Sequence, residues 1–256
     1  MSRITSAKEL FDLSSETVFV TGASSGLGAR FVEVLSAHGA KVVLAARRVD
    51  RIEAAAATLD NAIALPFDVT RPESYNRAFD QAEAVLGPIT LLVNNAGVDG
   101  PDDTLKFTPE DWRFVQGTNV DAIFNLSRLF AERRIEHGAP GNIINISSAA
   151  GYIVSETSTA YSVSKAAVVA MTKALAYELA PHKIRVNGIA PGYIYSEMTN
   201  GFLASDAGKE MVKRVPQRRV GEPSDLDGTL LLLASTKASG FMTGATVVVD
   251  GGISLK

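Results

Sequence analysis

Cysteine is absent from the 256-residue chain, and histidine occurs only three times. A chain without cysteine forms no disulfide framework and has no thiol nucleophile. His38, His137 and His182 are far apart in the sequence, and none has a ligand partner at helical spacing. We therefore expect surface histidines and no metal site.

The chain also lacks an excess of one charge and any long apolar run. Its 25 Lys and Arg residues and 28 Asp and Glu residues give a net charge of -3, and no basic run exceeds a pair such as Arg47-Arg48. This balance gives no support for nucleic-acid binding. Residues 1–16 lack the apolar core of a signal peptide, and no apolar stretch approaches a membrane span in length. We expect a cytoplasmic protein with neither a nucleic-acid nor a membrane partner.

Short apolar segments rich in Val, Ile and Leu recur along the chain, separated by longer stretches with apolar residues three and four apart. Strands without polar alternation are typical of a parallel sheet that is buried on both faces. The predicted strands are Thr17–Thr21, Lys41–Ala46, Ala62–Phe67, Thr90–Asn94, Asn142–Ser147, Arg185–Ile189 and Ala245–Val249. The predicted helices are Leu27–His38, Val49–Leu59, Pro72–Leu86, Pro109–His137, Thr159–Leu179 and Ser224–Ala234. The pattern predicts one α/β domain over residues 1–256, a doubly wound (Rossmann) parallel sheet of about seven strands with helices on both faces.

Residues 192–221 interrupt this alternation. The segment contains Met198, Phe202 and Met211 but no clear strand, so we expect an irregular excursion over the sheet. Excursions of this kind at the carboxyl edge of a sheet are often lids over a binding site. A surface helical hairpin without a functional role is the alternative.

The first predicted strand leads directly into a glycine-rich turn, Thr21-Gly22-Ala23-Ser24-Ser25-Gly26-Leu27-Gly28, and a helix follows. Glycines at such a turn let the backbone approach a phosphate, and the helix N-terminus offers free amides and the positive end of its dipole. The position favours a dinucleotide over a simple tight turn. The GK[ST] ending of a P-loop is missing, which disfavours ATP hydrolysis.

The end of the second predicted strand indicates which dinucleotide binds. An acidic residue about twenty positions beyond the glycines would hold the ribose hydroxyls of NAD. This chain has Ala46 there, followed by Arg47 and Arg48. Because a guanidinium matches a phosphate in charge and geometry, we expect NADP(H) rather than NAD(H), with Arg47 on the 2′-phosphate. Two solvated arginines at a helix start are the alternative.

Tyr161 and Lys165 are four residues apart in a predicted helix, so both lie on one face. A nearby ammonium favours the phenolate, and we expect Lys165 to lower the pKa of Tyr161 toward the working range. Ser148, thirteen residues before the tyrosine, would place a hydroxyl on the same carbonyl oxygen. The pair alone is also what a solvated helix face presents.

Several further motifs occur in a fixed order, and together they give the chain its resemblance to a known family. They are Thr21–Gly28, Asp68-Val69, Asn94-Asn95-Ala96-Gly97, Asn119, Ser148, Tyr161 with Lys165, and Pro191-Gly192-Tyr193-Ile194. Over nearly all of its length the chain resembles the short-chain dehydrogenase/reductase family of the single-domain type.

The resemblance implies a cofactor site. Its expected residues are Gly22, Ser24, Ser25, Gly26, Leu27, Gly28, Arg47, Arg48, Asp68, Val69, Asn95, Ala96, Gly97, Tyr161, Lys165, Pro191, Gly192, Ile194, Ser196 and Met198. Asp68 and Val69 would contact the adenine, and the backbone near Asn95 would contact the cofactor. Ile194 and Ser196 would contact the nicotinamide carboxamide; the family often has threonine where Ser196 stands.

The resemblance also implies the reaction, a hydride transfer between the nicotinamide and a carbonyl or alcohol carbon. Tyr161 would give or take the proton as the general acid or base. Lys165 would hold the nicotinamide ribose as well, Ser148 would orient the carbonyl, and Asn119 would hold a water that links Lys165 to solvent.

The substrate is expected to be an uncharged or modestly polar ketone or secondary alcohol, because the expected pocket is mainly aromatic and apolar. Ser148, Tyr161, Tyr193 and Phe202 would contact it. The remaining walls would come from Val98, Asp99, Ala149, Tyr152, Ser155, Met198 and Leu203.

Three other functions are weighed against this one. A 3-oxoacyl-[acyl-carrier-protein] reductase needs basic residues that dock an acidic partner, and Arg128, Arg133 and Arg134 could serve. However, Tyr177 stands where such reductases commonly carry an arginine.

A non-catalytic nucleotide-sensing protein would have a broken Ser, Tyr and Lys set, and here the set is complete. A methyltransferase or sugar-nucleotide epimerase would lack the Tyr-Lys pair or carry a larger substrate domain.

Members of the family commonly assemble, and the resemblance implies a homotetramer or homodimer formed through Pro109–His137, Thr159–Leu179 and the strand that leads into Val249–Gly252. Leu129, Val168 and Ala176 are apolar residues that we expect on the outer helix faces.

Overall fold

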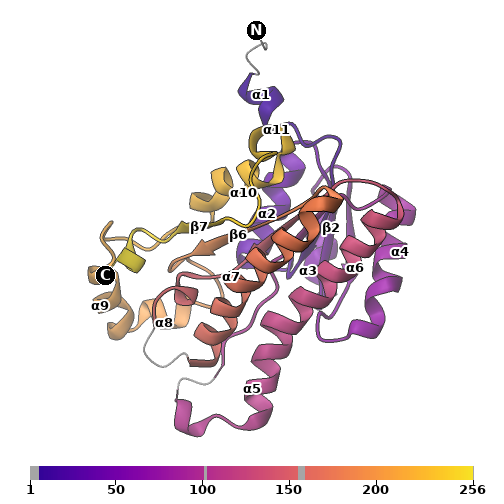
Figure 1. Ribbon diagram of the computed structural model, residues 1–256. Coiled ribbons are helices and arrows are strands. Elements are labelled where there is room, and N and C mark those ends of the chain that lie inside the picture. The colour runs from indigo at the N-terminus through magenta and orange to yellow at the C-terminus, as the bar shows by residue number, and fades with distance from the viewer. Residues whose placement is uncertain (1–5, 101–102, 155–158, 256) are drawn as a thin grey trace.

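In the computed structural model, residues 6–100, 103–154 and 159–255 are described. They form a seven-stranded sheet in the order β3-β2-β1-β4-β5-β6-β7, in which every pairing is parallel (Figure 1). The strands are β1 Thr17–Thr21, β2 Lys41–Ala46, β3 Ala62–Pro66, β4 Leu91–Asn94, β5 Gly141–Ile146, β6 Ile184–Pro191 and β7 Thr246–Val249. The predicted fold class is confirmed, and each predicted strand ends within two residues of the observed one.

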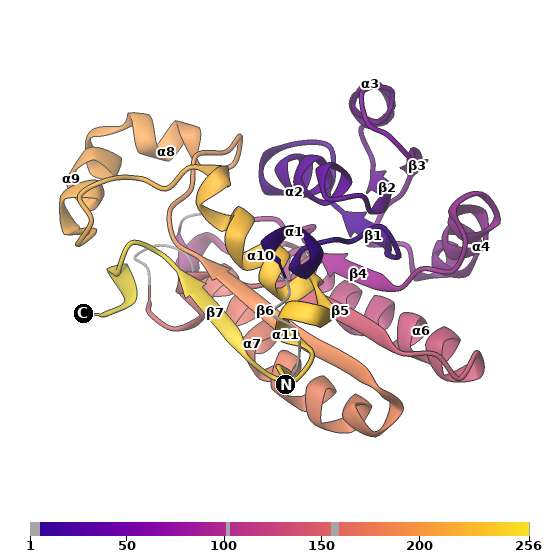
Figure 2. The same cartoon turned by 90° about the horizontal axis from the view of Figure 1, so that it is seen from above.

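Two apolar layers cover the sheet, one on each face, which is why the central strands have no polar alternation. Helices α2 Gly26–Ala37, α3 Val49–Ala56 and α10 Asp227–Ala234 pack on one face, contributing side chains such as Phe31, Ile52 and Leu230. The opposite face carries α4 Tyr75–Leu86, α6 Ala122–Glu136 and α7 Thr159–Leu179, with side chains such as Phe79, Phe130 and Leu175. Figure 2 shows the two helix layers on either side of the strands.

The strand order reverses direction between β1 and β4, and this reversal positions the site. From β1 the chain moves outward to β2 and β3, then returns to β4 on the other side of β1. The loops that leave β1 and β4 therefore diverge, and a crevice opens at their carboxyl ends.

The predicted helix Pro109–His137 is interrupted. It consists of α5 Pro109–Gln116, a π-helical turn over Gly117–Asp121, and α6. Thr108 and Asp111 form a capping box that starts α5. The π turn contains the buried Asn119, whose side-chain amide bonds the backbone of another loop instead of facing solvent. Such single π turns occur frequently at functional sites.

Residues 192–221 are more regular than expected. They contain α8 Asn200–Ala204 and α9 Asp206–Arg214, with the Ser205 hydroxyl accepting from the Gly208 amide at the start of α9. The two helices are held by a small apolar cluster of their own, formed by Leu203, Met211, Val215 and Val220. The short helices α1 Ala7–Leu10 and α11 Thr236–Ser239 were also not predicted, because four residues are too few to show a helical period.

The outer faces of the long helices differ from the prediction. Leu129, Val168 and Ala176 are buried within the chain, the first and last of them in the core layer under α6 and α7. They cannot contact another subunit. The exposed large apolar side chains of these helices are instead Trp112, Phe114, Phe124, Ile135, Val163 and Tyr177.

Among residues 6–100, 103–154 and 159–255, no helix is long and apolar enough to cross a membrane.

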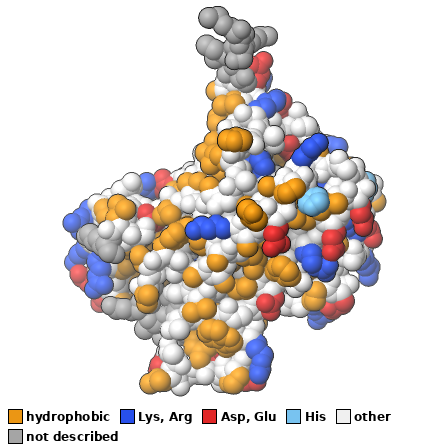
Figure 3. Space-filling model, viewed as in Figure 1, with side chains coloured by type: hydrophobic (Ala, Val, Ile, Leu, Met, Phe, Trp, Pro, Cys, Tyr) orange, Lys and Arg blue, Asp and Glu red, His pale blue; other side chains and the backbone are white. Residues whose placement is uncertain are grey.

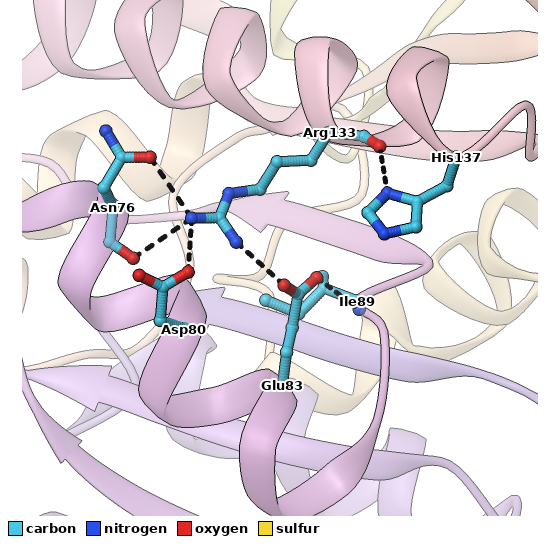
Figure 4. Close-up of polar contacts among 6 residues, drawn as sticks. All are labelled: Asn76, Asp80, Glu83, Ile89, Arg133 and His137. Carbon is cyan, nitrogen blue, oxygen red and sulfur yellow. Dashed lines mark hydrogen bonds and ion pairs between the residues drawn. The ribbon is translucent and has the colours of Figure 1, made fainter.

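Arg133 ties α6 to α4 on the face of the sheet that these two helices share (Figure 4). Its Nη2 donates to Asp80 Oδ1 at 2.6 Å and its Nη1 to Glu83 Oε2 at 2.8 Å. The same Nη2 reaches the backbone and side-chain oxygens of Asn76, both at 3.2 Å. The guanidinium also lies 5.6 Å from the ring centroid of Phe79, which adds a cation–π contact.

The neighbouring arginines are engaged in the same way. Arg128 pairs with Glu132 one turn along α6, at 2.5 Å, and the buried Arg134 donates to the Pro140 carbonyl at 2.8 Å. With Arg133 committed to α4, these three residues do not form a basic docking patch. The structure thus gives no support to their expected role with an acidic carrier protein.

Replacing Arg133 with alanine should destabilise the fold by about 2 kcal/mol, because its side chain is only 18% exposed and two carboxylates lose their partner. Arg128→Ala is the matched control on α6, where an exposed i,i+4 pair contributes below about 0.5 kcal/mol. Urea unfolding of both variants measures the difference. Equal losses would show that the α4–α6 network adds nothing beyond an exposed ion pair.

Candidate active site

The turn after β1 is shaped by two glycines with positive φ and by one that allows close packing. Gly22 and Gly26 have φ of +68° and +54°, a region that other residues rarely adopt. A Cβ on Gly28 would lie 2.3 Å from the Gly22 carbonyl oxygen, so α2 packs against the turn only with glycine there. Ser25 precedes α2 but makes no side-chain cap. The first amides of α2 therefore keep their capacity to bind an anion.

A cavity of about 430 Å³ runs from this turn to the carboxyl ends of β5 and β6. All but one of the residues predicted to bind the cofactor line it, namely Gly22, Ser24, Ser25, Gly26, Leu27, Arg47, Arg48, Asp68, Val69, Asn95, Ala96, Gly97, Tyr161, Lys165, Pro191, Gly192, Ile194, Ser196 and Met198. Gly28 is the exception, and the structure gives it the packing role described above. Motifs far apart in the sequence thus meet in one crevice.

The cavity has further lining residues that the sequence did not single out, and most adjoin one that it did. They are Phe67, Thr70, Phe114, Thr118, Ile146, Ser147, Glu197 and Thr199. The hydroxyl of the buried Thr118 has no hydrogen-bond partner among the described residues, an unusual state for a buried polar group.

Ser148, Tyr161 and Lys165 meet at one end of this cavity. Ser148 follows β5, and its hydroxyl accepts from the Ala150 amide at 3.1 Å and hydrogen-bonds the Tyr161 phenol. Lys165, one turn after Tyr161 on α7, lies with its Nζ 5.5 Å from the centroid of the tyrosine ring. The ammonium donates to the Ile146 carbonyl at 3.0 Å. The hydroxyl of Ser147 bonds the Lys165 carbonyl at 2.8 Å and fixes the strand end to the helix.

The pKa values of the pair differ from the expectation. Burial raises the pKa of Tyr161 to about 12, which outweighs the lowering by the Ser148 hydrogen bond. Burial also lowers the pKa of Lys165 to about 8, opposed by the nearby Asp99 carboxylate. Our prediction that Lys165 lowers the tyrosine pKa is not met, because burial is the largest effect and the ammonium faces the Ile146 carbonyl.

Asn119 lies behind the pair instead of on the cavity wall. Its Oδ1 accepts from the Val98 amide at 2.9 Å, while its Nδ2 donates to the Val98 carbonyl at 2.8 Å and to Ser164 Oγ at 3.0 Å. A Cβ on Gly97 would lie 3.4 Å from both Asn119 Oδ1 and Lys165 Nζ. Asn119 therefore fixes the loop after β4 against α7, close to the lysine.

Of the expected substrate contacts, Ser148 and Tyr161 line the cavity, whereas Tyr193 and Phe202 are not among its lining residues. Tyr193 and Phe202 stack at 5.9 Å between ring centroids, which joins α8 to the loop after β6. Phe202 is 42% exposed and Leu203 is buried beneath it. Tyr152 points elsewhere, toward a shallow groove along α7 that Tyr177 also lines. Ser155 lies outside the described residues.

The end of β2 carries the charges expected for a phosphate. Arg47 lies close enough to Asp68 to lower the pKa of that carboxyl, although the Thr70 hydrogen bonds lower it more and burial opposes both. Arg48 reaches across the turn and donates from Nε to Ser24 Oγ at 3.0 Å. No cluster of three or more His, Cys, Asp or Glu side chains that could hold a metal occurs in the described ranges.

Comparisons with known proteins agree over almost the whole chain. A family model described as Enoyl-(Acyl carrier protein) reductase matches residues 22–254. Galactitol 2-dehydrogenase (L-tagatose-forming) of Cereibacter sphaeroides is 38% identical over 253 residues, which cover 97% of this chain and 98% of that protein.

Solved structures are similarly close in fold. A short-chain type dehydrogenase/reductase from Mycobacterium marinum has a TM-score of 0.92 and 37% identity, covering 97% of this chain and 99% of that one. A gluconate 5-dehydrogenase from Burkholderia cenocepacia J2315, solved in complex with NADP and tartrate, has a TM-score of 0.92 and 32% identity, covering 98% of this chain and 100% of that one.

The buried amine of Lys165 should make stability rise with pH. Its ordinary pKa is 10.5 and its folded pKa about 8, so between these values the unfolded chain holds a proton that the folded chain does not. Relative to Lys165→Met, the wild type should gain about 3 kcal/mol of unfolding free energy between pH 7 and pH 10.5. Denaturant unfolding at several pH values measures this. Lys173→Met, an exposed lysine of α7, is the control, and a pH-independent difference for Lys165→Met would contradict the expectation.

Proposed function

The chain belongs to the short-chain dehydrogenase/reductase family, and from this premise we propose that its cavity binds NADP(H) while Tyr161 exchanges a proton with a substrate oxygen. The observation that carries the proposal is the meeting of Ser148, Tyr161 and Lys165 at one end of a crevice whose other end is a glycine-rich helix start. The predicted family is confirmed, as is the class, an oxidoreductase acting on secondary alcohols and ketones.

The residues present fit a dinucleotide with a 2′-phosphate. The positive-φ glycines leave the turn without side chains that would fill the cradle, and the helix start supplies amides for a pyrophosphate. Arg47 and Arg48 line the cavity where an acidic residue would otherwise hold a ribose hydroxyl. A structural neighbour solved with NADP supports the same preference, and NADP(H) is the cofactor of this chain.

When bound, NADP(H) supplies or accepts the hydride, and the protein handles the proton. Tyr161 holds that proton at its phenol oxygen, where burial keeps it in place at neutral pH. Ser148, bonded to the phenol, orients the substrate oxygen beside it. Lys165 is held at the Ile146 carbonyl beside the tyrosine ring, and from there its ammonium would bind a ribose hydroxyl of the cofactor. Asn119 keeps the loop after β4 in place. It would also hold a water that links the lysine to solvent.

The substrate we propose is a hydroxylated ketone or secondary alcohol of the polyol or sugar-acid type. Similarity to a galactitol dehydrogenase and a gluconate dehydrogenase supports this class. Tyr193 and Phe202 offer an apolar wall, and residues 192–221 form the lid of the single domain. The carrier-protein alternative is weaker, because Arg133 and its neighbours are committed to intramolecular contacts. The complete Ser, Tyr and Lys set argues against a non-catalytic sensor.

We further propose a cytoplasmic homotetramer or homodimer. Figure 3 shows hydrophobic side chains spread over the face that carries α5, α6 and α7. Tyr177 on α7 is 85% exposed, and Phe124 on α6 is 45% exposed. Phe241, which precedes the edge strand β7, is fully exposed, as expected of a surface that a second subunit covers.

Tyr161→Phe should lower kcat by about a thousandfold while NADPH still binds, because the ring keeps its shape but has no proton to give. The measurement is loss of NADPH absorbance with a panel of polyol-derived ketones and keto-acids, together with NADPH titration of both proteins. Tyr177→Phe on the exposed face of α7 is the matched control. An unchanged kcat in the Tyr161 variant would refute the proton role, and a wild type without turnover would favour the sensor.

Arg47→Ala should reduce the preference for NADPH over NADH by about tenfold, since a charge-assisted hydrogen bond to the 2′-phosphate is lost. The ratio of kcat/KM for the two cofactors measures this preference. Arg77→Ala, an exposed arginine of α4 outside the cavity, controls for the loss of one positive charge. A wild-type preference for NADH would remove Arg47 from the phosphate site.

A further inference from the structure

Glu197 lies where the lid begins and reaches back to the cofactor end of the cavity. Its carboxylate accepts from Arg48 Nη1 at 2.7 Å and also from Arg51 on α3. Glu197 lines the same cavity as Arg47, Arg48 and the glycine-rich turn. It is about 150 residues away from Arg48 in the sequence. The Glu197 carboxylate therefore lies at the arginines that we expect to bind the 2′-phosphate.

The turn that carries Glu197 is held by hydrogen bonds of its own. Thr199 Oγ1 accepts from the Ser196 amide at 3.0 Å and donates to the Ile194 carbonyl at 2.6 Å, and the Asn200 amide donates to the Ser196 carbonyl at 3.0 Å. These bonds hold Ile194–Asn200 as one unit. Glu197 is thus presented to Arg48 by a fixed backbone.

Three of the five N–H groups of Arg48 donate to oxygen acceptors. Its Nε donates to Ser24 Oγ, its Nη2 to Ser25 Oγ and its Nη1 to Glu197. The guanidinium is therefore anchored over the glycine-rich turn on one side and to the lid on the other. Hydrogen bonds from Arg48 and Arg51 lower the pKa of Glu197 to about 2, so its carboxylate is ionised at neutral pH.

Two anions cannot share one guanidinium edge without repulsion. On the basis of the proposed NADP(H) site, we propose that Glu197 competes with the 2′-phosphate for Arg48. This competition sets the cofactor preference and couples cofactor binding to the start of the lid. The 2′-phosphate displaces the carboxylate from Arg48, and Arg51 remains as the partner of Glu197 outside the cavity. A cofactor without that phosphate leaves the Arg48–Glu197 contact in place.

The test uses 2′,5′-ADP and 5′-AMP, two ligands that differ in the 2′-phosphate and carry no redox chemistry. Glu197→Gln keeps the size of the side chain and removes its charge. In isothermal titration calorimetry the variant should bind 2′,5′-ADP about fivefold more tightly than the wild type does, as expected for one exposed ion pair removed from competition. Its affinity for 5′-AMP should not change.

Two controls separate competition from a general gain in positive potential. Asp50→Asn removes an exposed carboxylate from α3, two residues from Arg48, and should leave 2′,5′-ADP affinity near the wild-type value. In an Arg48→Ala background the effect of Glu197→Gln should vanish, because the shared partner is gone.

Unchanged or weaker 2′,5′-ADP binding by Glu197→Gln, with NADPH still bound, would overturn the competition and leave the proposed function standing. An equal gain in Asp50→Asn would also overturn it. Absence of NADPH and 2′,5′-ADP binding in both the wild type and the variant would refute the proposed function and this inference together.

Discussion

Burial of a parallel sheet on both faces is the constraint on which the rest of the structure depends. Every strand must hydrogen-bond its neighbours while helices exclude water from both sides, so all connections return over a face and the strands point the same way. The loops at the carboxyl ends then gather at one edge. Where the order reverses between β1 and β4, those loops separate, and the cavity that holds Tyr161 and Arg47 is the result.

Much of the fold could be predicted because buried strands and helices leave a regular pattern of apolar residues in the sequence. Strands such as β1 consist of consecutive buried residues, and α4 keeps its apolar residues on one face. The π turn at Gly117–Asp121 left no such trace, since inserting one residue into a helix barely changes its composition. Helices α8 and α9 were missed because they pack on a small cluster of their own, too short for a clear period.

The site, like the fold, has features that the sequence predicts and features that only the folded structure shows. Gly22 could be predicted from the turn that follows β1, and Tyr161 and Lys165 from their spacing together with the order of the other motifs. The electrostatics were not, because the pKa of Tyr161 depends on how deeply α7 is buried and on which carbonyl Lys165 meets. The role of Glu197 could not be predicted for a similar reason, because only the folded chain brings its carboxylate to Arg48.

Two backbone hydrogen bonds join the ends of the segment 192–221, which we propose as the lid. The Tyr195 amide donates to the Gly221 carbonyl, and the Gly221 amide donates to the Tyr193 carbonyl, both at 2.9 Å. The two ends of the segment are thus already joined before anything binds, and the entropy of closing that loop is lost during folding instead of during each binding event. Any movement of α8 and α9 over a ligand would then cost only the change in their own packing.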